Sequence, residues 1–201
     1  MGQTTWVHRG ARMVMRPLAR TRVTPNQVTT VRLLTGIAAA AAFAMGERSW
    51  DIVGGTVFVL SAFLDRADGE LARLTGRTSI GGDRYDLLCD AASNMMAFTA
   101  IGIGLARGPL GLAAVALGLV SAIAIATGMW IADRLNHAGD EVIGTSTFDP
   151  DDALFIVGPA AWFGALDILL VAGAIGAPIF CLYAASRYRR RARAAAPLES
   201  D

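Results

Sequence analysis

The sequence contains little cysteine, and the positions of Cys89 and Cys181 exclude several classes of site. Both lie in apolar stretches, and their spacing fits neither a zinc site nor a disulfide framework. We therefore expect two buried, reduced thiols. Charge is also sparse: Asp, Glu, Lys and Arg make up 17% of the 201 residues, and the formal net charge is +1. No overall field would attract a polyanion, so we expect no nucleic-acid partner.

The chain is instead rich in apolar residues. Hydrophobic residues make up 54% of it, and the mean hydropathy is +0.46, which is rare for a soluble domain of this length. The first residues form no continuous apolar run, so we expect no cleaved signal peptide. The composition predicts an all-α, polytopic membrane protein.

Apolar stretches long enough for membrane helices recur along the chain. A bilayer core takes about 20 residues as a helix. A last stretch, residues 153–186, would be about 50 Å long as one helix, too long for a single crossing, and a turn near residues 164–167 would divide it in two. We therefore predict six transmembrane helices. The first four spans are residues 28–45, 52–64, 87–106 and 110–132.

The arginines gather at the two ends of the chain and in the connection after the second span. Such clusters mark the cytoplasmic flanks of membrane spans. We therefore expect an integral protein of the cell inner membrane with both termini and this connection in the cytoplasm, which requires an even number of crossings. The arginines are Arg9, Arg12, Arg16, Arg20, Arg22 and Arg32 at the start, Arg73, Arg77 and Arg84 in the connection, and Arg187, Arg189, Arg190, Arg191 and Arg193 at the end.

The segment before the first span differs from the spans. Between Thr5 and Thr21, apolar residues alternate with arginines at loosely helical spacing, which predicts an amphipathic helix on the membrane surface; the alternative is an unstructured basic tail. We divide the chain into a juxtamembrane segment (1–24), a six-helix catalytic domain (25–188) and a basic cytoplasmic tail (189–201).

Four aspartates lie at the membrane boundary in two pairs. Asp65 and Asp68 are three residues apart near the end of the second span, and Asp86 and Asp90 are four apart near the start of the third. Each pair shares a helix face, and the connection places both pairs on the same side of the bilayer. Four clustered carboxylates repel strongly unless counter-charges are present. Oxygen ligands suit magnesium, manganese or calcium, so the pattern predicts a divalent metal site.

Residues near these aspartates favour a phosphate ligand. Gly69 follows Asp68 directly, so a ligand could approach the helix backbone there. Gly82 precedes Asp86 by one helical turn and would widen the cleft or allow close packing. Arg73 lies within reach of a bound phosphate, and its planar guanidinium suits charged oxygens. Divalent metal and an arginine beside a phosphate are suited to phosphoryl transfer.

These residues closely resemble the signature of the CDP-alcohol phosphotransferase family. Eight fixed positions match within 26 residues. Six helices and an N-terminal surface helix also resemble this family, so the likeness covers most of the chain, although only the signature is specific. The matched segment is Asp65-x-x-Asp68-Gly69-x-x-Ala72-Arg73, then eight residues, then Gly82-x-x-x-Asp86-x-x-x-Asp90.

The resemblance implies roles for individual residues. It implies two Mg²⁺ or Mn²⁺ ions held by Asp65, Asp68 and Asp86, with Asp90 near the second ion and also the base that takes the acceptor's proton. The implied donor-binding residues are Gly69, Ala72, Arg73, Ser79 and Gly82, together with a short segment formed by Pro25, Asn26 and Thr29.

The implied reaction moves a phospho-alcohol group from a CDP-linked donor, CDP-diacylglycerol first of all, to a small hydroxylated acceptor in phospholipid biosynthesis, releasing CMP. A homodimer in contact with membrane lipid is implied as well. Three alternatives stay open: a soluble CDP-alcohol as donor to a lipid or polyol, an ion pathway or transporter, and an inactive scaffold. A transporter would spread acidic residues across the bilayer depth, whereas these gather at one side.

The segment from Asn136 to Asp152 bears on the identity of the acceptor. It is acidic and contains no Lys or Arg. Family members that take phosphorylated acceptors are expected to place basic residues here, so the sequence favours serine or inositol over glycerol phosphate or inositol phosphate. The alternative is an ordinary solvated loop. Positive charge could still come from Arg66, Arg77, Arg84 and Arg134.

Overall fold

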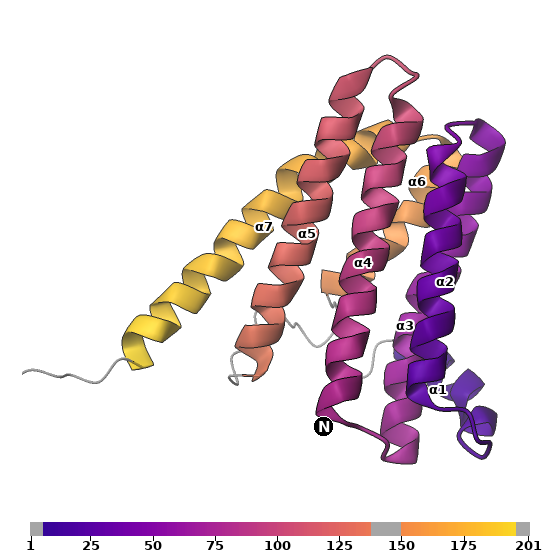
Figure 1. The fold of residues 1–201 in the computed structure, drawn as a ribbon, viewed down its shortest axis with the longest axis vertical. Helices are drawn as coiled ribbons and strands as arrows, with labels where there is room; N and C mark the ends of the chain where they lie inside the picture. The colour runs from indigo at the N-terminus through magenta and orange to yellow at the C-terminus, as the bar shows by residue number, and fades with distance from the viewer. Residues whose placement is uncertain (1–5, 138–149, 196–201) are drawn as a thin grey trace, which may run out of the picture.

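The computed structural model describes residues 6–137 and 150–195, and every regular element in these ranges is a helix (Figure 1). The predicted all-α class is confirmed for this part of the chain. In chain order the elements are α1 (Trp6–Leu18), α2 (Pro25–Ala44), α3 (Arg48–Thr75), α4 (Ile80–Leu105), α5 (Leu112–His137), the 3₁₀ helix η1 (Pro150–Ile156), α6 (Val157–Phe163) and α7 (Leu166–Ala195).

Local capping sets the helix ends near the aspartates. α2 begins with a capping box, in which Thr24 and Gln27 bond each other's backbone N–H groups, and Pro25 occupies the first turn. α3 ends at Gly76, whose φ of 64° is the left-handed conformation that glycine adopts without strain. The Ser79 hydroxyl then accepts from the Gly82 N–H at 3.0 Å and caps α4. The short connection between α3 and α4 makes them antiparallel neighbours.

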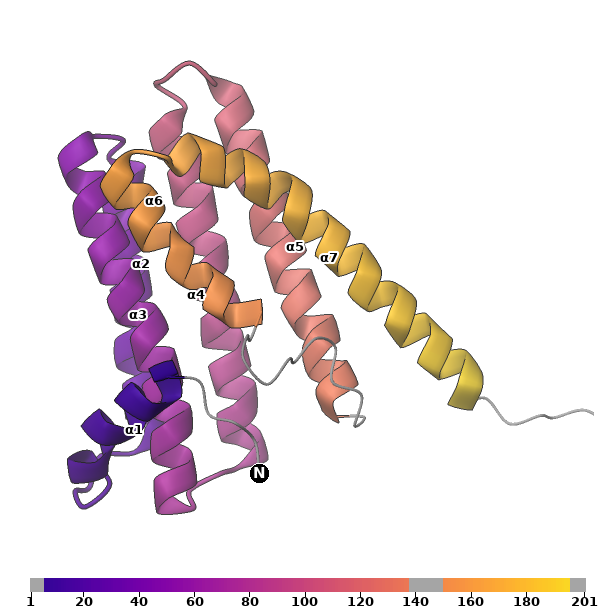
Figure 2. The ribbon, with the colours of Figure 1, turned by 180° about the vertical axis from the view of Figure 1, so that it is seen from behind.

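The helices α2 to α5 run side by side, α6 packs on α3, and α7 packs against α5 (Figures 1 and 2). Close contact between α4 and α5 depends on small residues. A Cβ added at Gly102 would lie 2.5 Å from the Ala114 carbonyl oxygen, and one at Gly118 would lie 2.6 Å from that of Phe98. The absence of side chains there lets the two backbones touch.

Four of the described helices are long and apolar enough to cross a membrane: α2, α4, the Leu112–Leu135 part of α5 and the Leu166–Arg191 part of α7. α3 is 28 residues long but does not meet this criterion, since its second half is polar, and the apolar helix Ala153–Phe163 is too short. The predicted turn in the last apolar stretch is confirmed, because Gly164, with a φ of 73°, ends α6. The count of six crossings stays a prediction.

The N-terminal helix α1 forms within the segment where the sequence predicted one. Ala11 and Met15 are buried, and Met15 packs in a cluster with Val28 of α2 and with Ala67 and Leu71 of α3. At least this part of its apolar face therefore contacts protein. Its position on the membrane surface stays a prediction.

Candidate active site

Three carboxylates from two helices meet at the end of the bundle where α3 ends and α4 begins. Asp65, Asp68 and Asp86 each offer one oxygen, and these oxygens all lie within 4.8 Å of one another. The two aspartates of α3 share a face because they are three residues apart, and the short connection brings Asp86 of α4 opposite them. The structure thus brings together residues that the sequence predicted as metal ligands.

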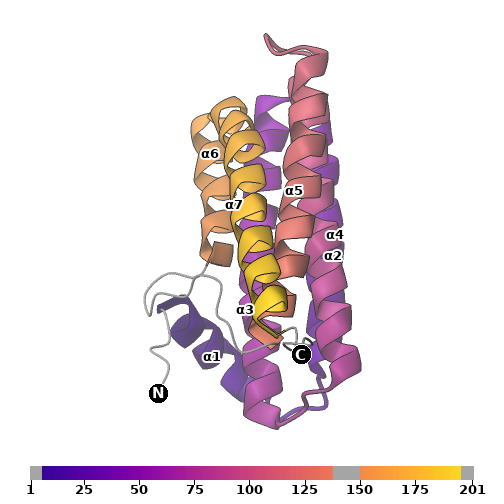
Figure 3. The same ribbon diagram turned by 90° about the vertical axis from the view of Figure 1, so that its left-hand side faces the viewer.

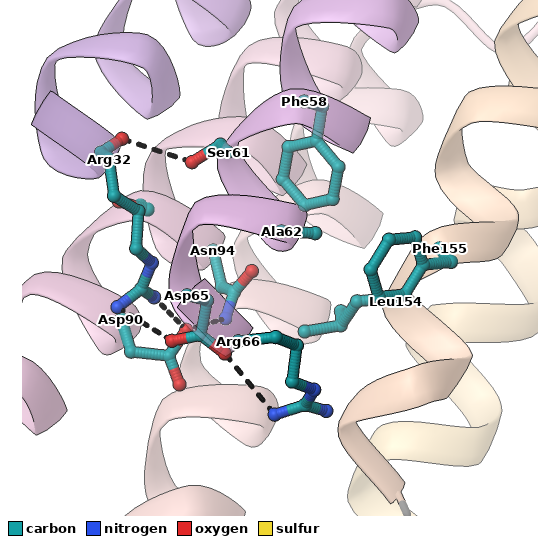
Figure 4. Close-up of a pocket in the computed structure, with 11 residues that line it drawn as sticks. Arg32, Phe58, Ser61, Ala62, Asp65, Arg66, Asp90, Asn94, Leu154 and Phe155 are labelled. Atoms are coloured by element: carbon teal, nitrogen blue, oxygen red, sulfur yellow. Dashed lines mark hydrogen bonds and ion pairs between the residues drawn. The ribbon is translucent and has the colours of Figure 1, made fainter. Parts of the chain in front are cut away.

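The fourth aspartate, Asp90, is joined to this group through Arg32 of α2 (Figure 4). One guanidinium nitrogen of Arg32 lies 2.9 Å from an oxygen of Asp65 and 3.1 Å from an oxygen of Asp86, and the other pairs with Asp90 Oδ1. The Arg32 side chain is 3% exposed. A single buried cation therefore contacts three carboxylates.

Arg32 was not identified from the sequence as the counter-charge, because it lies more than 30 residues before the aspartates along the chain. The available signal was a lone charge inside the first predicted span, which calls for a buried partner. The backbone of Arg32 is also fixed, since its carbonyl oxygen accepts a hydrogen bond from Ser61 Oγ of α3 at 3.0 Å.

The predicted Pro-Asn-x-x-Thr segment lies at the same end of the bundle. Thr29 is 2% exposed and donates to Asp68 Oδ2 at 2.7 Å, so the structure shows it holding a carboxylate. Pro25 opens α2. Asn26 faces Gly82 of α4, where its Oδ1 lies 3.3 Å from the position of an added Cβ.

The other signature residues form the end of α3 and the start of α4. The Arg73 guanidinium lies over Gly69, 3.7 Å from the position of an added Cβ, and this side chain is 54% exposed. Ala72 and Ser79 have local structural roles: the Ala72 carbonyl accepts from the N–H of Gly76, and Ser79 caps α4.

A small pocket adjoins Asp90 between α2, α3, α4 and η1 (Figure 4). Asn94 donates to Asp90 Oδ1 at 3.0 Å and fixes this carboxylate at the pocket wall. The buried hydroxyl of Ser93 has no hydrogen-bond partner among the described residues. The pocket has polar and apolar lining residues. Its lining consists of Arg32, Ser61, Asp65, Arg66, Asp90, Ser93 and Asn94 on the polar side and Phe58, Ala62, Leu154 and Phe155 on the apolar side.

The family model for CDP-alcohol phosphatidyltransferases matches residues 22–185. The chain belongs to this family. An archaetidylinositol phosphate synthase of Pyrococcus horikoshii is 34% identical over 87 residues, which is 43% of this chain and 45% of that protein, so the chain matches less than half of its relative's length.

Two solved structures of phosphatidylinositol phosphate synthase from Mycobacterium tuberculosis share the fold. The structure with CDP-DAG bound has a TM-score of 0.72 at 23% identity and covers 90% of this chain and 94% of that one. The complex with manganese and citrate has the same TM-score and identity and covers 89% and 88%. At this identity the likeness concerns the fold.

The charges of the site fit a divalent cation. The carboxylates of Asp65, Asp68, Asp86 and Asp90 face the guanidinium groups of Arg32 and Arg66, the latter 3.3 Å from Asp65. Four negative and two positive groups leave a formal charge of two negative. Closely spaced carboxylate oxygens are ligands that magnesium and manganese prefer.

The predicted acidic segment near the acceptor falls largely outside the described residues. Asp140, Glu141 and Asp149 are not described, nor are the side chains of Asp151 and Asp152. One of the basic residues named above, Arg134, is described. It lies on α5 over the ring of Trp130, 5.0 Å from the ring centre.

Proposed function

We propose that this chain transfers the phosphatidyl group of CDP-diacylglycerol to a hydroxyl of a small polar acceptor and releases CMP. The observation that carries the proposal is the cluster of Asp65, Asp68 and Asp86, tied through Arg32 to a fourth aspartate beside a pocket. The three clustered aspartates would hold Mg²⁺ or Mn²⁺. Two ions, with Asp90 near the second, follow from the family resemblance.

When bound, the metal would neutralise the diphosphate and stabilise negative charge on the departing CMP. The residues of the chain supply the rest. Asp90 is held through one oxygen by Arg32 and Asn94, and it takes the proton of the acceptor hydroxyl. The acceptor oxygen then bonds to the phosphorus next to the lipid, and the broken P–O bond leaves its electron pair on CMP. Gly69 and Arg73 would bind the diphosphate.

The pocket beside Asp90 supports an acceptor without net charge. Its two guanidinium groups pair with the carboxylates of Asp65 and Asp90. Asn94 and Ser93, whose hydroxyl has no hydrogen-bond partner in the described part of the chain, offer neutral hydrogen-bonding groups. A polyol or an amino alcohol such as serine suits such a lining, because each hydroxyl needs a partner once it leaves water.

Metal dependence is the first expected result. Purified protein in detergent micelles should release CMP from CDP-diacylglycerol only with acceptor and Mg²⁺ or Mn²⁺, and EDTA should abolish the reaction. Asp68→Asn should lower turnover at least about 100-fold, because even residues that only orient metal ligands contribute 10–100-fold. Asp51→Asn, at the opposite end of α3, is the matched control and should keep wild-type turnover. Full activity of Asp68→Asn would contradict the proposed metal site.

The second expected result concerns the choice of acceptor. With CDP-diacylglycerol and Mg²⁺, we expect turnover with inositol or serine and little with inositol phosphate or glycerol phosphate, measured as CMP released. Turnover with a phosphorylated acceptor alone would overturn the neutral acceptor while leaving the transferase proposal intact. CDP-choline in place of CDP-diacylglycerol tests the alternative of a soluble donor.

We also propose that the chain is an integral inner-membrane protein, a homodimer, with six crossings and its site and both termini in the cytoplasm. In support, α1 and the last turns of α7 lie at the end of the bundle that carries the aspartates (Figure 3). The four signature aspartates gather at this one end, which favours an enzyme over an ion pathway.

A further inference from the structure

A buried carboxylate lies between the signature residues Gly69 and Arg73. It is not itself a fixed position of the signature. The side chain of Glu70, next to Gly69 on α3, is 1% exposed. Its Oε2 accepts from Arg12 Nε of α1 at 3.1 Å, and its Oε1 accepts from a terminal nitrogen of Arg73 at 3.0 Å. One carboxylate therefore joins the N-terminal helix to a proposed donor-binding arginine.

Burial makes Glu70 the fixed point of this arrangement. A carboxylate withdrawn from water is costly unless it is paired and hydrogen-bonded. The two arginine side chains are 44% and 54% exposed, so water is available to them and not to Glu70. A free arginine side chain samples many rotamers, and pairing with a buried, immobile carboxylate restricts that sampling.

The pairing determines where the Arg73 guanidinium lies. Glu70 precedes Arg73 by three residues, so the side chain folds back along α3 toward Gly69. The guanidinium is thereby presented over bare backbone, directly beyond Asp68. A diphosphate that approaches Gly69 would meet the remaining N–H donors of Arg73 in a fixed orientation.

The packing of α1 against α3 places Arg12 beside Glu70. Its neighbour Ala11 is buried, and Met15, one turn later, packs against Ala67 and Leu71 of α3. Residues one turn apart share a helix face, so the docked face of α1 carries Arg12 toward the carboxylate.

We propose that Glu70 is a positioning residue, which holds Arg73 over Gly69 for the diphosphate of the CDP-linked donor, and that Arg12 makes α1 part of the donor site. This inference rests on the proposed function, because it requires such a donor.

The test compares Glu70→Gln, Arg12→Met and the double variant in the full chain. With Mg²⁺ present, Glu70→Gln should raise the Kd for CDP and the KM for CDP-diacylglycerol about three- to tenfold, because Arg73 must be ordered on binding, while kcat stays within about twofold. Arg12→Met should raise both less, and it should add nothing in the Glu70→Gln background. Arg16→Met removes an exposed charge from the same helix and should match wild type.

The two proposals fail in different ways. Wild-type CDP binding by Glu70→Gln, or a fall in kcat at unchanged KM, would overturn the positioning role alone. A wild-type chain that neither binds CDP nor releases CMP would overturn the proposed function. Should Glu70→Gln not fold by thermal unfolding, Arg12→Met against Arg16→Met carries the test: equal donor KM in these two would reject the role of α1.

Discussion

Replacing Asp90 with asparagine should abolish phosphatidyl transfer and leave CDP binding intact. The amide has the size of the carboxylate, and its oxygen can still accept from Arg32 and Asn94, which hold Asp90 in the structure. What is lost is a group that takes a proton from the acceptor hydroxyl. General base catalysis contributes about 10²- to 10⁴-fold, so turnover should fall by that factor.

The measurement is CMP release at saturating donor, acceptor and metal, beside calorimetric titration with CDP. Asp83→Asn, an exposed aspartate in the first turn of the same helix, is the control and should keep wild-type turnover. Equal turnover of Asp90→Asn and the control would remove Asp90 from its proposed role. Loss of CDP binding would assign it to the donor site.

Arg32→Met should be the most destabilising single substitution among the site residues. Arg32 pairs with Asp65, Asp86 and Asp90, and its loss leaves these three carboxylates without their shared cation. Removing one partner of a buried ion pair costs about 3–5 kcal/mol of unfolding free energy. Arg32→Lys should be intermediate, because an ammonium is a point charge that cannot bridge both sides as a guanidinium does.

Unfolding of the detergent-solubilised protein, with and without Mg²⁺, measures this effect. Arg20→Met, which removes an exposed arginine at the same end of the bundle, should unfold like wild type. Saturating Mg²⁺ should recover part of the loss in Arg32→Met, since a bound cation supplies positive charge and stabilises the folded state by mass action. Wild-type stability of Arg32→Met without metal would show that the ion pairs contribute little.

The sequence predicted the acidic cluster because its members are local. Asp65 and Asp68 share a helix face because they are three residues apart. The short connection between α3 and α4 makes these helices antiparallel neighbours and places Asp86 opposite the pair. The residues that complete the cluster come from α2, far away in the chain. Neither the Arg32 pairs nor the bond from Thr29 to Asp68 follows from spacing, because both depend on how α2 packs against α3 and α4.

Helix ends were predicted less well than helix existence, for a physical reason. An apolar run reports contact with lipid, whereas a helix continues as long as its backbone bonds and caps allow. The second helix was predicted to run from the apolar stretch 52–64 through Asp65 and Asp68, and α3 continues further, to Thr75, before it stops at Gly76. Similarly, residues 153–163 are apolar but form a helical segment that is shorter than the four long apolar helices.

The pocket has walls from separate parts of the chain, α2, the α3–α4 hairpin and η1. The α3–α4 hairpin contributes Asp65 and Asp90, whereas Leu154 and Phe155 come from the separate short segment η1. Substitutions in η1 are therefore expected to reshape the space for the proposed acceptor without moving Asp65 or Asp90. If the proposed function holds, a chain with this scaffold would change its acceptor through a few side chains of one short helix and keep the aspartates of α3 and α4 unchanged.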